Sequence, residues 1–346
     1  MWWKVLSVLL IIYSLVAGLL FPMKAGITNI SPQSIKTGTT QTLHIKGYNT
    51  AFADAGSNSF WLKLSDTLAI KCGDAIITDN NNIDVQVAVP QLLPQGIVEN
   101  KTFATLVVAN RIDGAFPYPE AIIITQDSTN NRSVGQWNQL PKDLEKSEYI
   151  SFPFRNILME TIRNTFYHVP MWFAMIFMFF VAAYYSGRAL KTRNSMYDHK
   201  ALAFTDAGLV FGCLGIVTGA LWAKHTWGAY WSFDVKQNMS AVCLLIYFAY
   251  FILRESFEDQ EKRARISAVF NIFAFSAVIP LLWVIPRLVD SLHPGNGGNP
   301  AFGTQDLDNT MRMIFYPANI GWILFGCWMA QLRYRLAAID EKILDV

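Results

Sequence analysis

Six stretches of apolar residues alternate with polar segments along the chain. A bilayer core of about 30 Å needs roughly 20 apolar residues in a helix, and each stretch approaches that length. The stretches cover residues 2–21 and about 169–185, 202–222, 239–253, 266–285 and 314–332. The pattern predicts an all-α integral membrane bundle of six transmembrane helices. Pro280 and Pro286 predict a kink near the end of the fifth helix.

The first apolar stretch has two interpretations. Lys4, the apolar run around it and the small residues Ala25 and Gly26 are compatible with a cleaved signal peptide. The length of the run favours instead a first transmembrane helix over residues 1–22 that stays in the mature protein. Both interpretations place the polar region that follows, residues 24–150, on the same side of the membrane.

Lysine and arginine predict the orientation, because they accumulate in cytoplasmic loops. They are frequent after the second and fourth helices and at the C-terminal end: Arg188, Lys191, Arg193, Lys200, Arg254, Lys262, Arg263, Arg265, Arg333, Arg335 and Lys342. The alternate loops are poorer in them. We therefore expect both termini, including a tail over residues 337–346, in the bacterial cytoplasm. Residues 24–165, 223–238 and 286–313 should face the periplasm.

Residues 26–125 have the pattern of a small all-β domain. Runs at 41–45, 60–64, 83–89 and 105–108 are rich in β-branched and aromatic residues, and turn signals separate them at Gly38, 47–49, 79–82, Gly96 and 113–114. This spacing predicts an extracytoplasmic antiparallel β-sandwich inserted after the first helix.

The opening of this region, residues 27–32 with Gly38 and 44–47, resembles IPT/TIG-type immunoglobulin-like domains. The resemblance implies a binding or spacer module without catalytic residues. Residues 126–165 are expected to form a linker. Its first part, 127–139, is rich in Asn, Ser and Gln and should be flexible, and 145–164 should form an amphipathic helix along the membrane face.

Composition narrows the function classes. About half of the residues are apolar and 16% are charged, below the quarter or so that is usual in soluble domains. The formal net charge of +2 does not indicate a nucleic-acid-binding protein, which would carry a strong excess of basic residues. The four cysteines are Cys72, Cys213, Cys243 and Cys327. They form no CxxC or CxxCH motif, which argues against a zinc site, a redox pair and covalently attached haem.

Three segments predicted at the same outer edge carry candidate chemistry. His168 begins the second helix and His293 follows the fifth. The loop between the third and fourth helices is rich in aromatic residues and holds Trp227, Gly228, Tyr230, Trp231, Phe233 and Asp234. Taken singly, the aromatic residues suit an interfacial belt, each histidine suits a hydrogen-bonding role, and Asp234 suits a helix cap.

The combination predicts a haem site. Two imidazoles from different helices can ligate haem iron axially, and clustered rings can stack on a flat macrocycle. Gly228 would allow the backbone to approach closely. These segments could therefore enclose one macrocycle, with an imidazole closing each face and the aromatic rings covering an exposed edge.

The same segments resemble a known family. Residues 208–224 and 227–234 are similar to the CcmC haem exporter family and its tryptophan-rich WWD motif, and 166–172 and 292–294 are similar to its two histidine motifs. The resemblance covers about residues 1–22 and 160–336. It implies a haem-handling membrane domain, with five of its helices in residues 166–336, that has no catalytic residues.

The resemblance also implies a function and partners. Such a protein would bind haem b noncovalently at the outer membrane face, with His168 and His293 as the axial iron ligands and the aromatic loop facing haem. It would present haem to a CcmE-like haem chaperone for c-type cytochrome biogenesis. It would work beside CcmA/CcmB-like ABC transporter subunits. The sequence departs from the family pattern at Tyr230 and Phe233, where tryptophan is usual, and at Lys236, where arginine is frequent. Both aromatic replacements keep a ring. The inserted β-sandwich is also unusual for the family.

Two other functions stay open. Residues 230–232 are closer to CcsA, which implies a cytochrome c synthase that joins haem to CxxCH thiols. That reaction needs further outward histidines, and His225 is the additional one; it could also compete as an iron ligand. The third possibility is a membrane receptor that binds a ligand through the β-sandwich.

The remaining polar candidates are expected away from the haem site. His199 falls in a cytoplasmic loop and His44 in the β-sandwich. Asp206, near the inner end of the third helix, is an intramembrane acid and therefore a functional candidate. With Thr205, it is predicted to cap the start of that helix.

Overall fold

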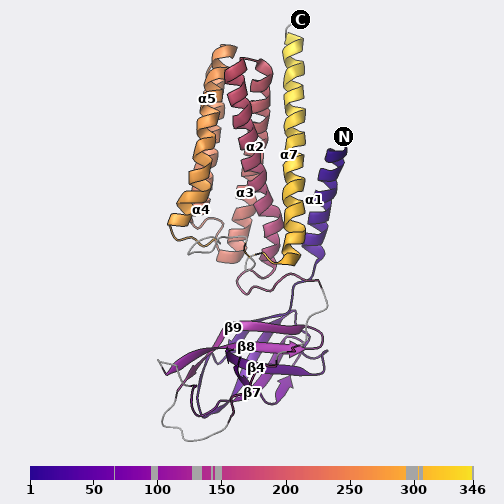
Figure 1. Ribbon diagram of the computed structural model, residues 1–346, viewed down its shortest axis with the longest axis vertical. Helices are drawn as coiled ribbons and strands as arrows, with labels where there is room; N and C mark the ends of the chain where they lie inside the picture. The colour runs from indigo at the N-terminus through magenta and orange to yellow at the C-terminus, as the bar shows by residue number, and fades with distance from the viewer. Residues whose placement is uncertain are drawn as a thin grey trace. The chain divides into compact units, whose positions relative to one another are not determined.

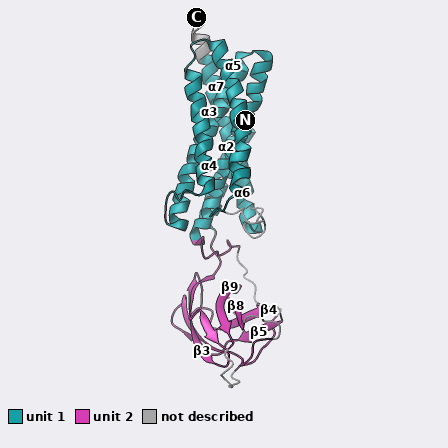
Figure 2. Cartoon of the chain, turned by 90° about the vertical axis from the view of Figure 1, so that its left-hand side faces the viewer, with its two compact units in different colours: residues 1–21, 160–346 teal, residues 22–159 magenta. Residues whose placement is uncertain are grey.

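The computed structural model describes residues 1–65, 67–94, 100–126, 135–141, 143–144, 150–293, 303 and 307–344. The chain divides into two compact units (Figure 2). The membrane unit comprises residues 1–21 and 160–346, and the β unit comprises residues 22–159.

The described residues contain six helical segments that are long and apolar enough to cross a membrane. They are α1 (Trp2–Leu20), η1 with α2 (Met159–Asn164 and Thr165–Thr192), α3 (Ser195–Trp227), α4 (Val235–Glu255), α5 with η2 and α6 (Gln260–Ile279, Pro280–Val284 and Ile285–Leu288), and α7 (Asn309–Leu344). The predicted number of helices is confirmed. The fifth changes from α-helix to π-helix at Pro280, where the prolines predicted a kink.

Helices α2 and α3 form the centre of the membrane unit (Figure 1). Glycines on α3 let the two helices approach closely. A Cβ atom at Gly208 would lie 2.5 Å from the Phe179 ring, and one at Gly212 would lie 2.9 Å from Sδ of Met175. On α4, Tyr247 stacks on Phe179 with 3.5 Å between ring centroids. The helices are therefore fixed by close packing of small and aromatic residues.

Helix α1 packs against α7. The buried Ser7 hydroxyl donates to the carbonyl oxygen of Gly321 at 2.9 Å, and Tyr13 donates to that of Met313 at 3.2 Å. The guanidinium of Arg163, at the start of the second span, donates to carbonyl oxygens at the end of α1: those of Gly18, Leu19 and Phe21. These oxygens have no partner within the helix, so Arg163 caps α1.

Ion pairs connect α3 to other helices. Near the start of α3, the buried Asp198 binds both terminal nitrogens of Arg254 on α4. Further along the same helix, Asp206 pairs with Arg333 of α7 at 2.9 Å. The prediction that Asp206 caps α3 is wrong, because α3 begins at Ser195 and its cap is Asn194, whose side chain accepts from the N–H of Met196. Hydropathy does not predict these first two turns, because residues 195–201 include Ser195, Asp198, His199 and Lys200.

The β unit consists of two sheets around one core. One sheet has the order β1-β3-β7-β6, and the other has the order β2-β9-β8-β4-β5. The strands are β1 (Gly26–Ser31), β2 (Ser34–Lys36), β3 (Thr40–Tyr48), β4 (Asn58–Ser65), β5 (Leu68–Lys71), β6 (Ala75–Ile77), β7 (Asn82–Ala88), β8 (Lys101–Asn110) and β9 (Gly114–Thr125). Inward-facing residues such as Leu43, Val85 and Leu106 are fully buried. All pairs are antiparallel except β2 with β9.

The turn signals act as predicted where they are described. Gly38, Asn49 and Gly114 have positive φ angles, which glycine and asparagine tolerate best. The Asp79 carboxylate accepts from the N–H groups of Asn81 and Asn82, and hydrogen bonds from Asn82 and Asn81 lower the pKa of Asp79. Gly96 lies outside the described residues.

The region expected as linker and interfacial helix is described in part. Residues 127–134 and 145–149 lie outside the described residues. In the remainder of the expected helix, 150–164, the structure has only the 3-10 helix η1. Phe152 instead pairs with Met23 in an isolated β-bridge, so the described part of this segment runs beside the start of the β unit.

Candidate functional site

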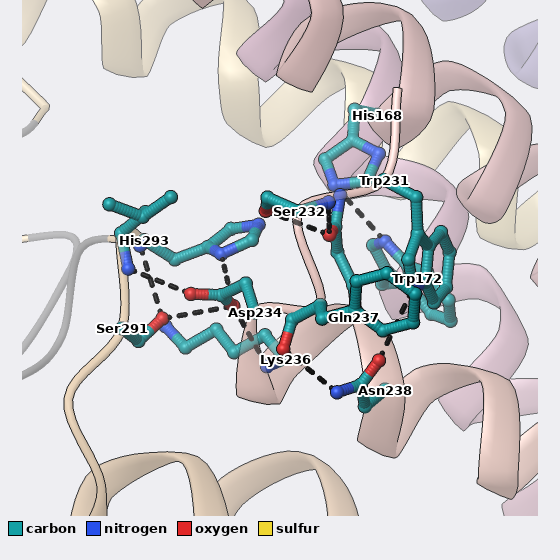
Figure 3. A network of polar contacts seen from close by, with 12 residues as sticks. His168, Trp172, Trp231, Ser232, Asp234, Lys236, Gln237, Asn238, Ser291 and His293 are labelled. Carbon is teal, nitrogen blue, oxygen red and sulfur yellow. Dashed lines mark hydrogen bonds and ion pairs between the residues drawn. The ribbon is translucent and has the colours of Figure 1, made fainter. Parts of the chain in front are cut away.

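Distant segments meet at one end of the membrane unit, which we call the site end. There, α1, α3 and α6 finish and α2 and α4 begin. Thr161, before α2, is 3.2 Å from Thr226 at the end of α3. The loop between α3 and α4 contacts the segment after α6 through Asp234 and His293 (Figure 3). The three sequence segments with candidate chemistry therefore lie at the same end of the bundle.

Asp234 organises two of these segments. Its carboxylate caps α4 by accepting from the N–H of Lys236 at 2.9 Å. It also accepts from the Ser291 hydroxyl at 3.1 Å, the Leu292 N–H at 2.7 Å and Nδ1 of His293 at 2.8 Å. Burial opposes the charged carboxylate, but the hydrogen bonds from His293 and Leu292 outweigh burial and hold the pKa of Asp234 well below its ordinary value. The predicted cap is present and has further partners.

Only one ring nitrogen of His293 is hydrogen-bonded to a residue that the structure describes. Because Asp234 is a carboxylate, Nδ1 of His293 carries the proton and donates it. Nε2 makes no hydrogen bond to any residue that the structure describes. The ring meets Trp227 edge to face, with 4.7 Å between centroids. Asp234 and Trp227 thus fix the orientation of an imidazole whose Nε2 has a lone pair available for a metal.

His168 lies deeper, in the first turn of α2, and is only 8% exposed. Nδ1 is 3.1 Å from Oγ1 of Thr218, and Nε2 is 3.2 Å from Nε1 of Trp172. Trp222 also meets the imidazole edge to face, at 5.7 Å. A Cβ atom at position 219 would be 2.6 Å from Cε1 of His168, so the absence of a side chain at Gly219 makes room for the ring.

The aromatic loop is held from α4. Gln237 accepts from the N–H and the hydroxyl of Ser232, and Asn238 accepts from the indole of Trp231 at 3.2 Å. Gly228 ends α3 with a φ of 86°, which favours glycine. The rings of Tyr230 and Phe233 are 56% and 77% exposed. The backbone of the loop is therefore fixed while two of its rings face outward.

The other three histidines are not part of this arrangement. His225 is exposed on α3 and makes no hydrogen bond to the described residues. His199 is in the first turns of α3, at the opposite end of the bundle from Trp227. His44 pairs with Asp84 inside the β unit at 2.7 Å. The structure thus places His168, His225 and His293 at the site end of the membrane unit, His199 at its opposite end and His44 in the β unit.

The sequence pattern alone does not single out the residues that hold the site. They are Trp172, Thr218 and Trp222 around His168, and Ser291, Gln237 and Asn238 around the loops. Trp172 was detectable, because it lies four residues after His168 and so on the same helix face. The others contact the site only through tertiary packing.

The site residues suit a large flat ligand that contains a metal. His293 offers a free nitrogen, and Trp227, Tyr230 and Trp231 offer ring faces and edges. His168 offers a second imidazole, although its Nε2 is already hydrogen-bonded. The model of one protein family, CcmC, described as heme exporter protein C, matches residues 153–345, which is more than half of the chain. The chain belongs to this family.

Individual CcmC relatives agree with this assignment. Heme exporter protein C of Escherichia coli is 25% identical over 183 residues, which cover 52% of this chain and 72% of that protein. The Bradyrhizobium diazoefficiens protein of the same name is 30% identical over 112 residues, 32% of this chain and 43% of that protein. A cytochrome c biogenesis protein CcsA from Synechococcus is 36% identical over 77 residues, 22% of this chain and 25% of that protein.

The chain spans less than half of the length of the last two relatives. The CcmC match begins at residue 153, so α1 and nearly all of the β unit lie outside it. The matched part contains His168, the aromatic loop and His293. The two histidines and the aromatic loop therefore belong to the part of the chain that matches the family model.

Proposed function

We propose that this chain binds haem at the site end of its membrane unit and presents it for c-type cytochrome biogenesis. The observation that carries the proposal is the contact of Asp234 with His293, beside Trp227. It joins the two loops that would enclose the ligand. The names of the relatives, heme exporter protein C and cytochrome c biogenesis protein CcsA, support haem as the cargo.

In this proposal His168 and His293 are the axial ligands of a noncovalently bound haem b. Nε2 of His293 is the better prepared ligand, because Asp234 already holds the opposite nitrogen. Trp227, Tyr230, Trp231, Phe233 and Gly228 would form the surface around the macrocycle. The chain itself makes and breaks no covalent bond, so it acts as a haem transporter rather than an enzyme.

The membrane orientation in this proposal follows from the charges. Arg254, Lys262, Arg263 and Arg265 are near the end of α4 and the start of α5, opposite the site end. The positive-inside rule then puts that end in the cytoplasm and the site end at the periplasmic face. The β unit, which connects α1 to α2 through their site-end termini, is on the periplasmic side as well.

Partners follow from this placement. The exposed rings of Tyr230 and Phe233 provide an apolar contact surface for a CcmE-like haem chaperone, which would take haem from the loop. CcmA/CcmB-like ABC transporter subunits would associate with the membrane helices. Aromatic residues at the centre of such a contact contribute strongly to binding.

The proposal is tested by the haem content of purified full-length protein. Pyridine extraction should release haem from the wild type and almost none from the His168→Ala/His293→Ala double variant. His225→Ala is the matched control, because His225 lies near the loop but is exposed, and this variant should keep wild-type haem. Normal haem in the double variant, or a colourless wild type that cannot be loaded with haem, would contradict the proposal.

The match to CcsA supports a second candidate function, a cytochrome c synthase. In that case the protein would join haem vinyl groups to CxxCH thiols of an apocytochrome. Incubation of the haem-loaded chain with a reduced apocytochrome distinguishes the two functions. Haem that stays attached to the cytochrome after denaturation indicates a synthase, whereas haem that is fully extracted indicates a carrier.

A further inference from the structure

The hydrogen bonds of His168 determine which of its nitrogens carries the proton. The indole nitrogen of Trp172 is only a donor, so Nε2 of His168 must accept from it. The Thr218 hydroxyl donates to the carbonyl oxygen of Leu214 at 2.8 Å, which leaves Oγ1 as the acceptor for Nδ1. His168 is therefore a neutral imidazole that is protonated on Nδ1, and its one lone pair is bound by Trp172.

The two histidines consequently differ in how available their Nε2 atoms are to bind a metal. Both have Nδ1 held by a protein acceptor, Asp234 for His293 and Thr218 for His168. Nε2 of His293 has no partner among the described residues, whereas Nε2 of His168 accepts from Trp172 at 3.2 Å. A metal approaching the site meets one available lone pair and one that is already engaged.

We infer that Trp172 is an internal competitor for His168, which occupies its iron-binding nitrogen whenever haem is absent. The inference rests on the proposed haem function and concerns its regulation. Haem binds first to His293, and ligation by His168 follows only when the indole N–H leaves Nε2. On handover the same N–H returns to His168, which favours release of the haem.

The packing around Trp172 explains why this competition is specific. The imidazole is buried and reaches Trp172 and Trp222 at similar distances, with ring centroids at 6.0 and 5.7 Å. Only Trp172 donates to it, because the indole N–H of Trp222 is directed to Oγ1 of Thr161 at 3.3 Å. A Cβ atom at position 215 would lie 2.8 Å from the Trp172 ring, so Gly215 is what lets this ring sit between α2 and α3.

A haem-free measurement tests the hydrogen bond itself. In full-length protein labelled with ¹⁵N-tryptophan, the indole signal of Trp172 is assigned as the one lost in Trp172→Phe. It should shift in His168→Ala, while the indole signal of Trp231, which donates to Asn238, should not. A Trp172 signal that is unchanged in His168→Ala would overturn the inference.

Haem transfer tests the consequence. Haem-loaded variants are mixed with excess apomyoglobin, and the rate of haem loss is followed by absorbance. Without the competing N–H, Trp172→Phe should lose haem about two- to tenfold more slowly than Trp222→Phe. Trp222→Phe is the matched control, since it replaces an indole beside His168 by the same phenyl ring but removes no hydrogen bond to that imidazole. In a His168→Ala background the two substitutions should give the same rate.

The outcomes separate the two proposals. A wild type that binds no haem contradicts the proposed function, and the role of Trp172 falls with it. If the wild type binds haem but Trp172→Phe and Trp222→Phe release it equally fast, only the competition is wrong. A difference between them that persists without His168 would also overturn the competition, because the effect of Trp172 would then not act through that imidazole.

Discussion

The carboxylate of Asp234 and the imidazole of His293 are 59 residues apart in the chain and 2.8 Å apart in the structure. This contact connects the loop before α4 to the segment after α6. The same carboxylate caps α4, so the position of His293 is fixed relative to a membrane helix. Any ligand of His293 is thereby held at a defined place above the bundle.

Substitution of Asp234 by asparagine should weaken haem binding by about ten- to a hundredfold, because a charge-assisted hydrogen bond to His293 contributes about 1.5–3 kcal/mol. Asparagine caps helices as well as aspartate does, so α4 should remain folded. The reduction potential of the haem should also rise, since a nearby negative charge that favours ferric iron is lost. Haem titration and redox titration measure the two effects.

The control for this prediction is Asp290→Asn. Asp290 is exposed and lies three residues before His293, so its replacement removes a charge near the site without removing a ligand contact. An equal loss of affinity in both variants would show that Asp234 acts through general electrostatics and not through His293.

Gly219 should be intolerant of a side chain. Alanine at this position would place Cβ 2.6 Å from Cε1 of His168 and should cost about 1–3 kcal/mol of stability through overpacking, together with reduced haem affinity. Gly187 on α2 is the matched control, because a Cβ there has open space. Gly187→Ala should be neutral or slightly stabilising. Thermal unfolding in detergent would compare them; equal melting temperatures would contradict the close packing.

Much of the fold was predictable, because a membrane helix requires a long apolar stretch and a strand requires a short run of β-branched and aromatic residues between turns. The apolar stretches predict the six membrane-crossing segments found among the described residues. Of the nine strands in that part of the chain, the sequence located four: β3, β4, β7 and β8. The start of α3 was missed, since Ser195, Asp198, His199 and Lys200 make residues 195–201 too polar to predict a membrane helix. They form helix because Asn194 caps it and Asp198 is neutralised by Arg254. Single-sequence hydropathy contains no information about that pairing.

The sequence indicated the residue types of the candidate site but not the hydrogen bonds between them. His168, His293 and the aromatic loop stand out by residue type and motif. The link between Asp234 and His293 depends on how α4 and α6 pack, and the bond from Trp172 to His168 depends on the glycines of α3. Such contacts are set by tertiary structure. The assignment of the two histidines as haem ligands stays a prediction.

Cys72 should be unreactive in the folded β unit. Burial raises the pKa of its thiol to about 12, so almost no thiolate is present at pH 8. A maleimide reagent should label Cys72 slowly in native protein and readily after denaturation, as peptide mass spectrometry can measure. Rapid labelling of Cys72 in native protein would show that the sheet core around it opens.

Helix α1 should remain in the mature protein. Its buried Ser7 binds α7, and Arg163 caps its last turn, so removal would expose polar groups in both partners. N-terminal sequencing of protein purified from membranes should therefore show that residues 2–20 are retained. An N-terminus near Gly26 would instead support the signal-peptide interpretation.

The account depends most on the claim that His168 and His293 bind the same iron. Electron paramagnetic resonance of ferric haem in the purified full-length protein tests this directly. We predict a low-spin, bis-imidazole spectrum in the wild type and a high-spin spectrum in both His168→Ala and His293→Ala. A low-spin spectrum that survives unchanged in either single variant would contradict the claim.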